Sequence, residues 1–416
     1  MGVIPRAKEM SRRDLQDRLF WIAREDEIKN ARTTDVYFLN TKEVLTKNNI
    51  ESEVVMEVYV RDLLPYQGIW GILTGVYEVA KLLEGLPVDV WSFEEGSVFL
   101  ADAASAMYEP VMTIVGRYSD FVEYENPILG LLAASTGVAT RAARLKAAAG
   151  QKSLFSFGTR RVHPALAPLI ERNCYVAGFD GVSNVLGGEL LGRKPTGTMP
   201  HALIQVVGDQ SKAWKMFDRT IPKSVKRTAL VDTFWDEKSE SIKAFETLGK
   251  DLWAVRLDTP SSRRGNFRKI VEEVRWELDI RGGRDVKIIV SGRITEEDMI
   301  QLGPLVDGFG IGTAVAYPPV VDFSAKIVEV KAEGKWRYRG KRGGLGGRKT
   351  VFRSKGYKDT VILAGGETPK GQESLLKPLI RRGMIISEFL EVDRLRSRTT
   401  KEIRAVAQSE PALGWA

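Results

Sequence analysis

The sequence has almost none of the residues from which disulfide frameworks and zinc sites are built. Its 416 residues include one cysteine, Cys174, and two histidines, His163 and His201. One cysteine cannot form an internal disulfide, and three such residues are too few for an ordinary four-ligand zinc site. We therefore expect no disulfides, no zinc site and a cytoplasmic location.

Long apolar runs are missing as well. None reaches the roughly 18 residues that a membrane-spanning helix needs. Residues 1–20 are charged and lack the apolar core of a signal peptide, so we expect none. Hydrophobic residues still make up 43% of the chain, enough for two or three domains with cores. The composition thus predicts a globular protein without a membrane partner.

The net charge of +8 is concentrated in one strip of the sequence. Residues 331–358, which we call the basic strip, hold eleven Lys and Arg and one acid, Glu333. Such a strip is either a solvated loop or a surface for a phosphate-rich partner. No signature of an RNA- or DNA-binding module accompanies it. We therefore expect no nucleic-acid partner and keep nucleic-acid binding as an alternative.

The spacing of apolar residues and the distribution of charge divide the chain into three parts. Residues 1–118 show the mixed helices and strands of an α+β domain. Within residues 119–325, helices alternate with seven short apolar runs, which favours a parallel barrel over an open Rossmann sheet. Residues 326–416 are basic and strand-like, then helical. We predict an α/β fold, an incomplete (β/α) barrel of about seven strands, with a second α+β, sandwich-like domain formed by the N- and C-terminal segments.

Each apolar run of the predicted barrel ends in glycine and polar residues. The runs are SLFSFGTRR, YVAGFDGVS, the GTMPHA region, TALVDTF, LWAVRLDT, VKIIVSGR and DGFGIGT. In a parallel barrel, chemistry collects at the C-terminal ends of the strands. Asp232 and Asp258 end two consecutive runs, and Arg256 stands just before the second. This arrangement fits a site for Mg²⁺ and pyrophosphate better than two helix caps. His163 is better explained as a helix-start or packing residue.

In order and spacing, the seven runs resemble the nicotinate phosphoribosyltransferases. TTDVY, residues Thr33–Tyr37, also matches the Thr-Asp-x-Tyr segment of that family. The resemblance spans roughly residues 30–350 and is particularly close to the short archaeal-type members of the type II phosphoribosyltransferases. Some of those carry a cysteine-bearing zinc segment near the C-terminus. The corresponding stretch here, VFRSKGYKDTVILAGGETPKG, has no cysteine.

The resemblance implies a reaction and a site. Nicotinate would displace pyrophosphate from phosphoribosyl pyrophosphate, giving nicotinate mononucleotide, with Mg²⁺ held near Asp232 and Asp258. The pyridine ring would lie between Phe157 and Tyr37. The other implied contacts are Arg160 and Arg256 with Ser183 or Asn184 for the carboxylate, Ser291, Gly292, Gly312 and Thr313 for the 5′-phosphate, and Lys341 and Lys349 of the basic strip for further phosphates.

His201 lies in the segment Gly197-Thr198-Met199-Pro200-His201, which matches the family's Gly-Thr-x-x-His motif. The resemblance implies that ATP phosphorylates this histidine and that ATP hydrolysis is coupled to nucleotide synthesis. It also implies that Tyr37 reaches into the barrel of a neighbouring subunit. We therefore expect ATP as a co-substrate and a homodimer or higher homo-oligomer with shared active sites.

Two activities of the same fold remain alternatives. Nicotinamide phosphoribosyltransferases place an aspartate near the position of Ser183 and Asn184, and these residues here favour an anionic substrate, although Asp180 is close in sequence. Quinolinate phosphoribosyltransferases need no ATP-linked histidine and surround a dicarboxylate with more basic residues. The sequence matches that pattern less well.

Overall fold

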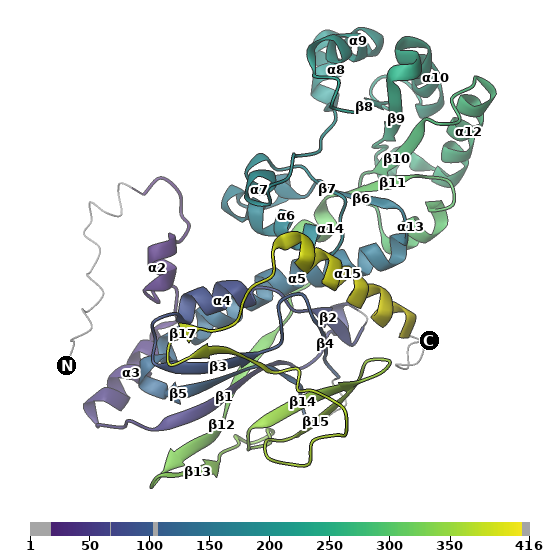
Figure 1. Ribbon diagram of the computed structural model, residues 1–416. Coiled ribbons are helices and arrows are strands. Elements are labelled where there is room, and N and C mark those ends of the chain that lie inside the picture. Colours follow the sequence, from purple (N-terminus) through teal and green to yellow (C-terminus); the bar gives the residue numbers. More distant parts are fainter. Residues whose placement is uncertain (1–17, 67, 103–106, 410–416) are drawn as a thin grey trace. The chain divides into compact units, whose positions relative to one another are not determined.

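The computed structural model describes residues 18–66, 68–102 and 107–409 and forms two compact units (Figure 1). The sheet unit consists of the described residues up to Thr136 together with residues 320–389. The barrel unit consists of residues 137–319 and of the chain from Leu390 to the end of the described part. In the described ranges, no helix is long and apolar enough to cross a membrane.

Two parts of the sequence predictions fall outside the described residues. These are residues 1–17, most of the segment examined for a signal peptide, and residues 410–416, the end of the predicted third domain. The predicted fold class is confirmed, because a parallel half-barrel is accompanied by a separate antiparallel unit from both ends of the chain. The unit boundary near residue 136 lies inside a helix, α5 (Glu125–Ala149), whereas the sequence pattern suggested residue 118.

The sheet unit is formed around seven antiparallel strands in the order β13, β12, β1, β5, β3, β16, β17. Seven of the eight residues of β1 are buried, as its run of β-branched residues favours. Two short antiparallel pairs, β2 with β4 and β14 with β15, complete the strands. The strands are β1 Glu53–Val60, β2 Trp70–Ile72, β3 Val88–Ser92, β4 Val98–Leu100, β5 Pro110–Arg117, β12 Phe323–Ala332, β13 Lys335–Tyr338, β14 Lys349–Ser354, β15 Lys358–Leu363, β16 Lys377–Arg381 and β17 Met384–Ile385.

Helices cover the core of the sheet unit. In α4 (Val76–Leu83), the residues at spacings of three and four, Val76, Val79, Ala80 and Leu83, are all buried. They pack in one apolar cluster with residues of β1, β3 and β5. The other helices of this unit are α2 (Glu25–Lys29), α3 (Val36–Lys47) and the first part of α5.

The barrel unit contains six parallel strands in the order β7, β6, β11, β10, β9, β8. Figure 1 shows α10 and α12 side by side along the same sheet, where they contact each other. The strands are β6 Ser153–Ser156, β7 Gly181–Val182, β8 Arg227–Leu230, β9 Leu252–Leu257, β10 Lys287–Ser291 and β11 Gly308–Ile311. The helices are α6 Ala167–Val176, α7 Val185–Leu190, α8 His201–Val207, α9 Gln210–Thr220, α10 Glu237–Leu248, α11 Ser261–Arg264, α12 Phe267–Ile280, α13 Glu296–Leu302, α14 Thr313–Ala316 and α15 Val392–Ser409.

The barrel is open between β7 and β8. These strands are consecutive in the chain but form the two edges of the sheet. The GTMPHA run, predicted as a strand, lies between them: residues 193–200 are irregular, and helix α8 begins at His201. Pro195 and Pro200 have no N–H to donate to a neighbouring strand, which explains why no strand forms here. The sheet therefore has six strands rather than about seven, and His201 begins a helix.

The last helix of the described chain, α15, belongs to the barrel unit and packs on α6. Leu395, Ile403 and Val406 are buried, and the Arg396 guanidinium donates to the carbonyl oxygens of Gly178 and Phe179. The sequence prediction placed this helix in the C-terminal part, residues 326–416, outside the barrel domain. Its amphipathic pattern is evident from the sequence, but the surface that it covers is not.

Candidate active site

The loops that follow the parallel strands surround a cavity of about 860 Å³, which we call the front cavity. Most residues predicted for the site from the sequence line it, although they come from six separate loops. They are Phe157, Arg160, Ser183, His201, Arg256, Asp258, Ser291, Gly292, Gly312 and Thr313. The C-terminal edge of a parallel sheet thus brings together the residues that the sequence motifs indicated.

His201 is held between two carboxylates at the edge of this cavity. Its Nε2 lies 3.8 Å from Oδ1 of Asp232 and 3.7 Å from Oδ2 of Asp258. Its Nδ1 lies 3.1 Å from the hydroxyl oxygen of Thr233. The approach of Asp258 raises the pKa of His201, against the opposing effect of partial burial. The Thr233 hydroxyl therefore contacts one ring nitrogen, and the two carboxylates flank the other.

Asp232 and Asp258 lie next to each other but differ in their surroundings. Asp232 accepts a hydrogen bond from the backbone N–H of Asp258 through Oδ2 (3.0 Å), while its Oδ1 is buried without a hydrogen-bond partner. Burial raises the pKa of Asp232 to about 7. Burial also acts to raise the pKa of Asp258, but His201, Arg256 and the Ser291 hydroxyl outweigh it and lower that pKa.

This pair of carboxylates fits a divalent cation. Mg²⁺ is usually held by one or two carboxylates together with substrate phosphates and water. The buried Oδ1 of Asp232 offers an unused oxygen beside Asp258 and the front cavity. Across the described residues, no group of three or more His, Cys, Asp and Glu is arranged to hold a metal ion by itself. The residues therefore suit a cation that phosphates of a substrate help to bind.

Glu240 organises the loop that carries Thr233, although it belongs to none of the sequence motifs described above. It is fully buried on α10. Its Oε2 accepts from the backbone N–H of Thr233 (3.1 Å), and its Oε1 accepts from Phe234 (2.8 Å) and Trp235 (2.9 Å). The carboxylate thus fixes the loop whose hydroxyl contacts His201. A possible signal in the sequence is its position one turn before Ala244, on the buried face of an otherwise polar helix.

The ring of Phe157 rests directly on the backbone of β11. A Cβ at Gly310 would lie 2.4 Å from Cε2 of that ring, and one at Gly308 would lie 3.3 Å from the ring of Phe155. Glycines at alternate positions of β11 therefore make room for two phenyl rings on the inner face of the sheet. The guanidinium of Arg256 lies 5.8 Å from the centre of the Phe157 ring and donates to the Met199 carbonyl oxygen (3.2 Å).

The turn after β10 is suited to a phosphate. Gly292 has φ of 89°, a left-handed conformation that favours glycine. A Cβ there would also come within 3.1 Å of Oδ1 of Asp258. Ser291 donates from its hydroxyl to that same carboxylate oxygen (2.8 Å). Arg264, a residue without a sequence motif, donates to the carbonyl oxygens of Thr259, Ser291 and Gly292 and so links the loops after β9 and β10.

Two residues predicted to bind substrate also have structural roles, and the substrate contact of Asn184 stays a prediction. Asn184 is the N-cap of α7, where its side-chain oxygen accepts from the backbone N–H of Gly187 (2.8 Å). Lys349 is buried in the sheet unit, and its Nζ donates to Oε2 of Glu57 (2.8 Å) and to the carbonyl oxygens of Leu345 and Gly347. Three acceptors occupy the three donors of an ammonium group. The prediction of a phosphate contact for Lys349 is corrected accordingly.

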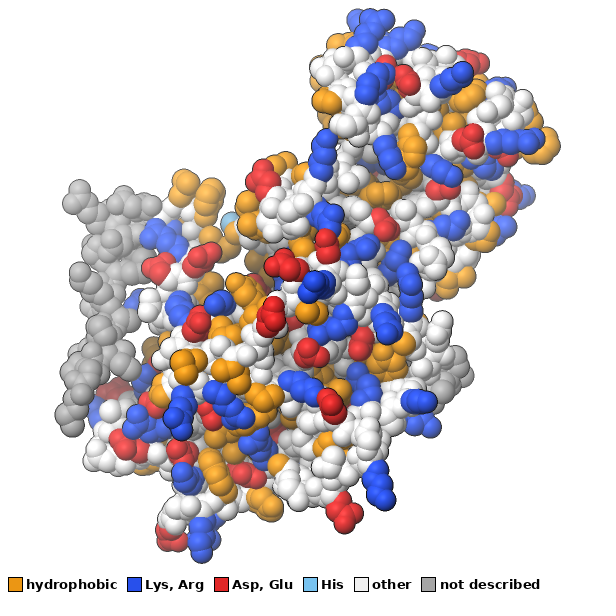
Figure 2. All heavy atoms as spheres, in the orientation of Figure 1, with side chains coloured by type: hydrophobic (Ala, Val, Ile, Leu, Met, Phe, Trp, Pro, Cys, Tyr) orange, Lys and Arg blue, Asp and Glu red, His pale blue; other side chains and the backbone are white. Residues whose placement is uncertain are grey.

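Other charges of the basic strip also have partners in the sheet unit. Lys331 pairs with Glu53, Arg337 with Glu333, and Arg353 with Asp359. Figure 2 shows basic side chains (blue) and acidic side chains (red) interspersed on the visible surface. The strip is therefore partly matched by its own Glu333 and by Glu53 and Asp359 outside it, whereas Lys341 remains exposed. His163 caps the short 3₁₀ helix Pro164–Leu166 through Nδ1, consistent with the helix-start interpretation.

Tyr37 lies in the sheet unit near the start of α3 and is about half exposed, at 54%. Its neighbours Val36 and Leu39 are also exposed, at 68% and 48%. Its predicted contact with the pyridine ring therefore stays a prediction.

Comparisons with known proteins agree with this architecture. The family model "quinolinate phosphoribosyl transferase, C-terminal domain" matches residues 138–326, and the corresponding N-terminal domain matches residues 35–136. A solved structure of nicotinate-nucleotide pyrophosphorylase from Pyrococcus furiosus is 50% identical, with a TM-score of 0.88, and the match covers 94% of this chain and 99% of that one.

Two further relatives are more distant. A nicotinate phosphoribosyltransferase from Mycobacterium tuberculosis is 26% identical over 418 residues, covering 90% of this chain and 87% of the relative. The structure of human nicotinic acid phosphoribosyltransferase has a TM-score of 0.68 at 18% identity, covering 89% and 93%, and shows the shared fold. Both units are thus those of a phosphoribosyltransferase, and the chain belongs to the nicotinate phosphoribosyltransferase family.

Proposed function

We propose that the protein forms nicotinate mononucleotide and pyrophosphate from nicotinate and phosphoribosyl pyrophosphate, with coupling to ATP hydrolysis through a phosphohistidine at His201. The observation that carries the proposal is the position of His201 between Asp232 and Asp258 at the edge of the front cavity. A histidine in a site with two carboxylates suits acceptance of a phosphoryl group near a pyrophosphate site.

The pyridine acid would bind at the Phe157 end of the cavity. The face of Phe157 offers a stacking surface, and such aromatic pairs contribute about 0.5–1.5 kcal/mol beyond burial. Arg256 lies beside this ring, and one of its buried N–H donors, Nε, has no acceptor within the described protein. A carboxylate of the substrate would supply that acceptor, with Arg160 and Ser183 on the same cavity wall.

The phosphate groups of phosphoribosyl pyrophosphate would bind at the end of the front cavity away from Phe157. Backbone N–H groups around Ser291, Gly292 and Thr313 suit the 5′-phosphate of the ribose. Asp232 and Asp258 would hold Mg²⁺, which neutralises charge on the departing pyrophosphate when it is bound. As pyrophosphate leaves, the anomeric carbon becomes positively charged, and the nitrogen lone pair of the pyridine forms the new bond to it.

His201, in its neutral form, would attack the γ-phosphate of ATP through the lone pair of Nδ1, and ADP would leave as the phosphorus–nitrogen bond forms. The contact between Nδ1 and the Thr233 hydroxyl orients the ring, while Asp232 and Asp258 can accept the proton that Nε2 releases. His201→Ala should abolish acid-labile labelling from γ-labelled ATP but leave some ATP-independent transfer. Full labelling of this variant would contradict the role of His201 as the phosphorylated residue.

We further propose that Tyr37 of a neighbouring subunit closes the ring site. This rests on the family resemblance and on the exposed position of Tyr37 among other exposed apolar residues of α3. Tyr37→Ala and Asp258→Ala should each be nearly inactive alone. After subunit exchange, a mixed dimer has one site with both residues intact, so activity should return towards about a quarter of wild type. No recovery after proven exchange would contradict shared sites.

Quinolinate is a second candidate substrate, because both matched domain models carry the name of quinolinate phosphoribosyl transferase. Four arginines also line the front cavity: Arg160, Arg161, Arg256 and Arg293. Quinolinate would have to lose its extra carboxylate as CO₂ to give the same mononucleotide.

One experiment separates these activities. The protein is incubated with phosphoribosyl pyrophosphate, Mg²⁺ and nicotinate, nicotinamide or quinolinate, with and without ATP, and the mononucleotide is measured. The proposal expects product from nicotinate, more of it with ATP. Product from quinolinate with release of CO₂, and none from nicotinate, would establish the second candidate instead.

A further inference from the structure

A second cavity lies inside the incomplete barrel. It encloses about 590 Å³, and we call it the barrel cavity. In a closed barrel the interior is filled by layers of side chains from all strands. Here the edge strands β7 and β8 do not pair, and residues 194–198 line the cavity where a further strand would stand. The missing strand therefore leaves space that the remaining side chains do not fill.

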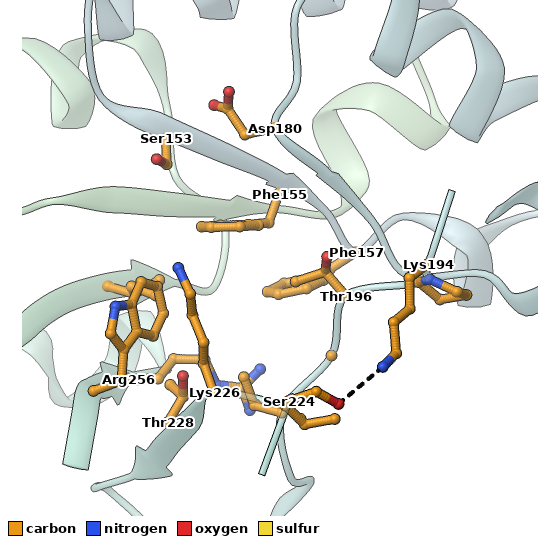
Figure 3. A pocket seen from close by; sticks show the side chains of 16 residues that line it. Ser153, Phe155, Phe157, Asp180, Lys194, Thr196, Ser224, Lys226, Thr228 and Arg256 are labelled. Atoms are coloured by element: carbon orange, nitrogen blue, oxygen red, sulfur yellow. Dashed lines mark hydrogen bonds between the residues drawn. The ribbon is translucent and has the colours of Figure 1, made fainter. Parts of the chain in front are cut away.

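The walls of the barrel cavity combine aromatic rings with cations. Figure 3 shows the rings of Phe155 and Phe157 on one side of the cavity and Lys226 extending towards them from the other. The Nζ of Lys226 lies 4.1 Å from the centre of the Trp253 ring. At the end of the cavity drawn on the right, Lys194 donates to the Ser224 hydroxyl (3.1 Å).

The charge of this lining is positive. Its cations are Lys194, Lys226 and Arg256, and its acid is Asp180. Asp180 is already engaged by Lys146 (3.7 Å), by Arg396 (3.3 Å) and by the backbone N–H of Leu154 (3.0 Å). The two lysines are exposed, whereas Trp253 is half-buried. An aromatic interior with a cationic rim fits a ligand that joins a planar ring to an anionic group.

We propose that the barrel cavity is a binding site for a nucleoside phosphate. The base contacts Phe155 and Trp253, and the phosphate meets Lys194, Lys226 and the Ser224 hydroxyl. A phosphate suits the lysine rim because ammonium groups on flexible stems bind it as point charges. The volume falls within the usual 300–1,000 Å³ of small-molecule sites and exceeds what a single pyridine ring requires.

The barrel cavity shares a wall with the front cavity. Phe157, Gly197, Thr198 and Arg256 line both. A ligand that contacts Phe157 or Arg256 from the barrel side changes the surface that the pyridine acid meets, so binding at the two cavities is coupled. This coupling rests on the proposed function of the front cavity, whereas binding to the barrel cavity does not.

Calorimetric titration with AMP and with nicotinate mononucleotide tests the proposal on the full chain. The double variant Lys226→Ala/Trp253→Leu should weaken binding of at least one of these nucleotides about tenfold or more, through lost phosphate and ring contacts. Ribose 5-phosphate, which lacks the base, and adenosine, which lacks the phosphate, should bind more weakly. The matched control is Lys269→Ala/Trp276→Leu, which changes exposed residues of α12 outside both cavities.

A front-cavity variant, Asp258→Asn, separates the two sites. Nucleotide binding that persists in this variant and is lost in Lys226→Ala/Trp253→Leu supports the barrel site, whichever of the two bases is preferred. Binding that is lost in Asp258→Asn and unchanged in the double variant overturns it, as does the absence of binding of both nucleotides to the wild type. Transferase assays of the same proteins test the proposed function independently, because failure to form a mononucleotide does not affect the titration.

Discussion

Glu57 in the sheet unit and Asp232 in the barrel unit are both buried carboxylates, but their partners differ. Glu57 accepts from the backbone N–H of Lys349 (2.6 Å) and from its Nζ (2.8 Å). Asp232 accepts from a backbone N–H through one oxygen, and its other oxygen has no hydrogen-bond partner. Burial raises the pKa of both groups. Glu57 thus has its charge matched by a cation inside the fold, whereas Asp232 keeps one oxygen that no protein donor satisfies.

The largest expected effect of this difference is on stability. Lys349→Ala leaves Glu57 buried without its cation, which should lower the free energy of unfolding by roughly 3–5 kcal/mol. Lys377→Ala is the control, because its pair with Glu373 is exposed and should contribute at most about 1 kcal/mol. Denaturant titration measures both. A raised KM for phosphoribosyl pyrophosphate with unchanged stability would instead return Lys349 to a phosphate-binding role.

Asp232→Asn should show the opposite pattern. Activity should fall about 10²- to 10³-fold, the usual cost of removing one group that stabilises charge in the transition state. Stability should not fall, because asparagine keeps the oxygen that accepts from the Asp258 N–H, and the other oxygen has no hydrogen bond to lose. The exposed Asp285→Asn is the matched control. Loss of stability without loss of activity would show that Asp232 is structural, as Glu57 is.

Gly310→Ala tests whether substrate binding in the front cavity depends on the position of the Phe157 ring. The new methyl group would lie within contact distance of the ring and must displace it, at a cost of about 1–3 kcal/mol for an overpacked site. The KM for nicotinate should rise more than the KM for phosphoribosyl pyrophosphate. Gly130→Ala, on α5 with open space around it, should change neither KM. Equal rises of the two KM values would contradict a specific contact between Phe157 and the ring of nicotinate.

The smallest expected effect is the change of Mg²⁺ affinity with pH. A carboxylate must lose its proton to bind a cation, and the pKa of Asp232 is about 7. The affinity for Mg²⁺ should therefore rise with pH and level off above about pH 7, falling up to about tenfold for each pH unit below it. Mg²⁺ titration of binding between pH 5.5 and 8 measures this. An affinity that does not change across this range would place the cation elsewhere.

Sequence patterns predicted the barrel and most of the front cavity because strand-end residues meet at one edge of a parallel sheet. They failed where the outcome depends on partners far away in the chain. Lys349 belongs to the basic strip, but Glu57, almost three hundred residues earlier, determines its role. Glu240 lies in a polar helix, and only the fold shows the loop that wraps around its carboxylate. Asn184 caps α7 through its side-chain oxygen, a role that the residue type alone does not distinguish from a ligand contact.

The position of α15 affects the order in which the protein can fold during synthesis. The parallel strands are complete once residue 311 has been made, but the helix that packs on α6 is formed by residues 392–409. Between them, the ribosome must produce strands of the other unit. The apolar surface of α6 that Leu395, Ile403 and Val406 help to cover therefore stays uncovered for some 80 residues of translation, several seconds at ordinary elongation rates.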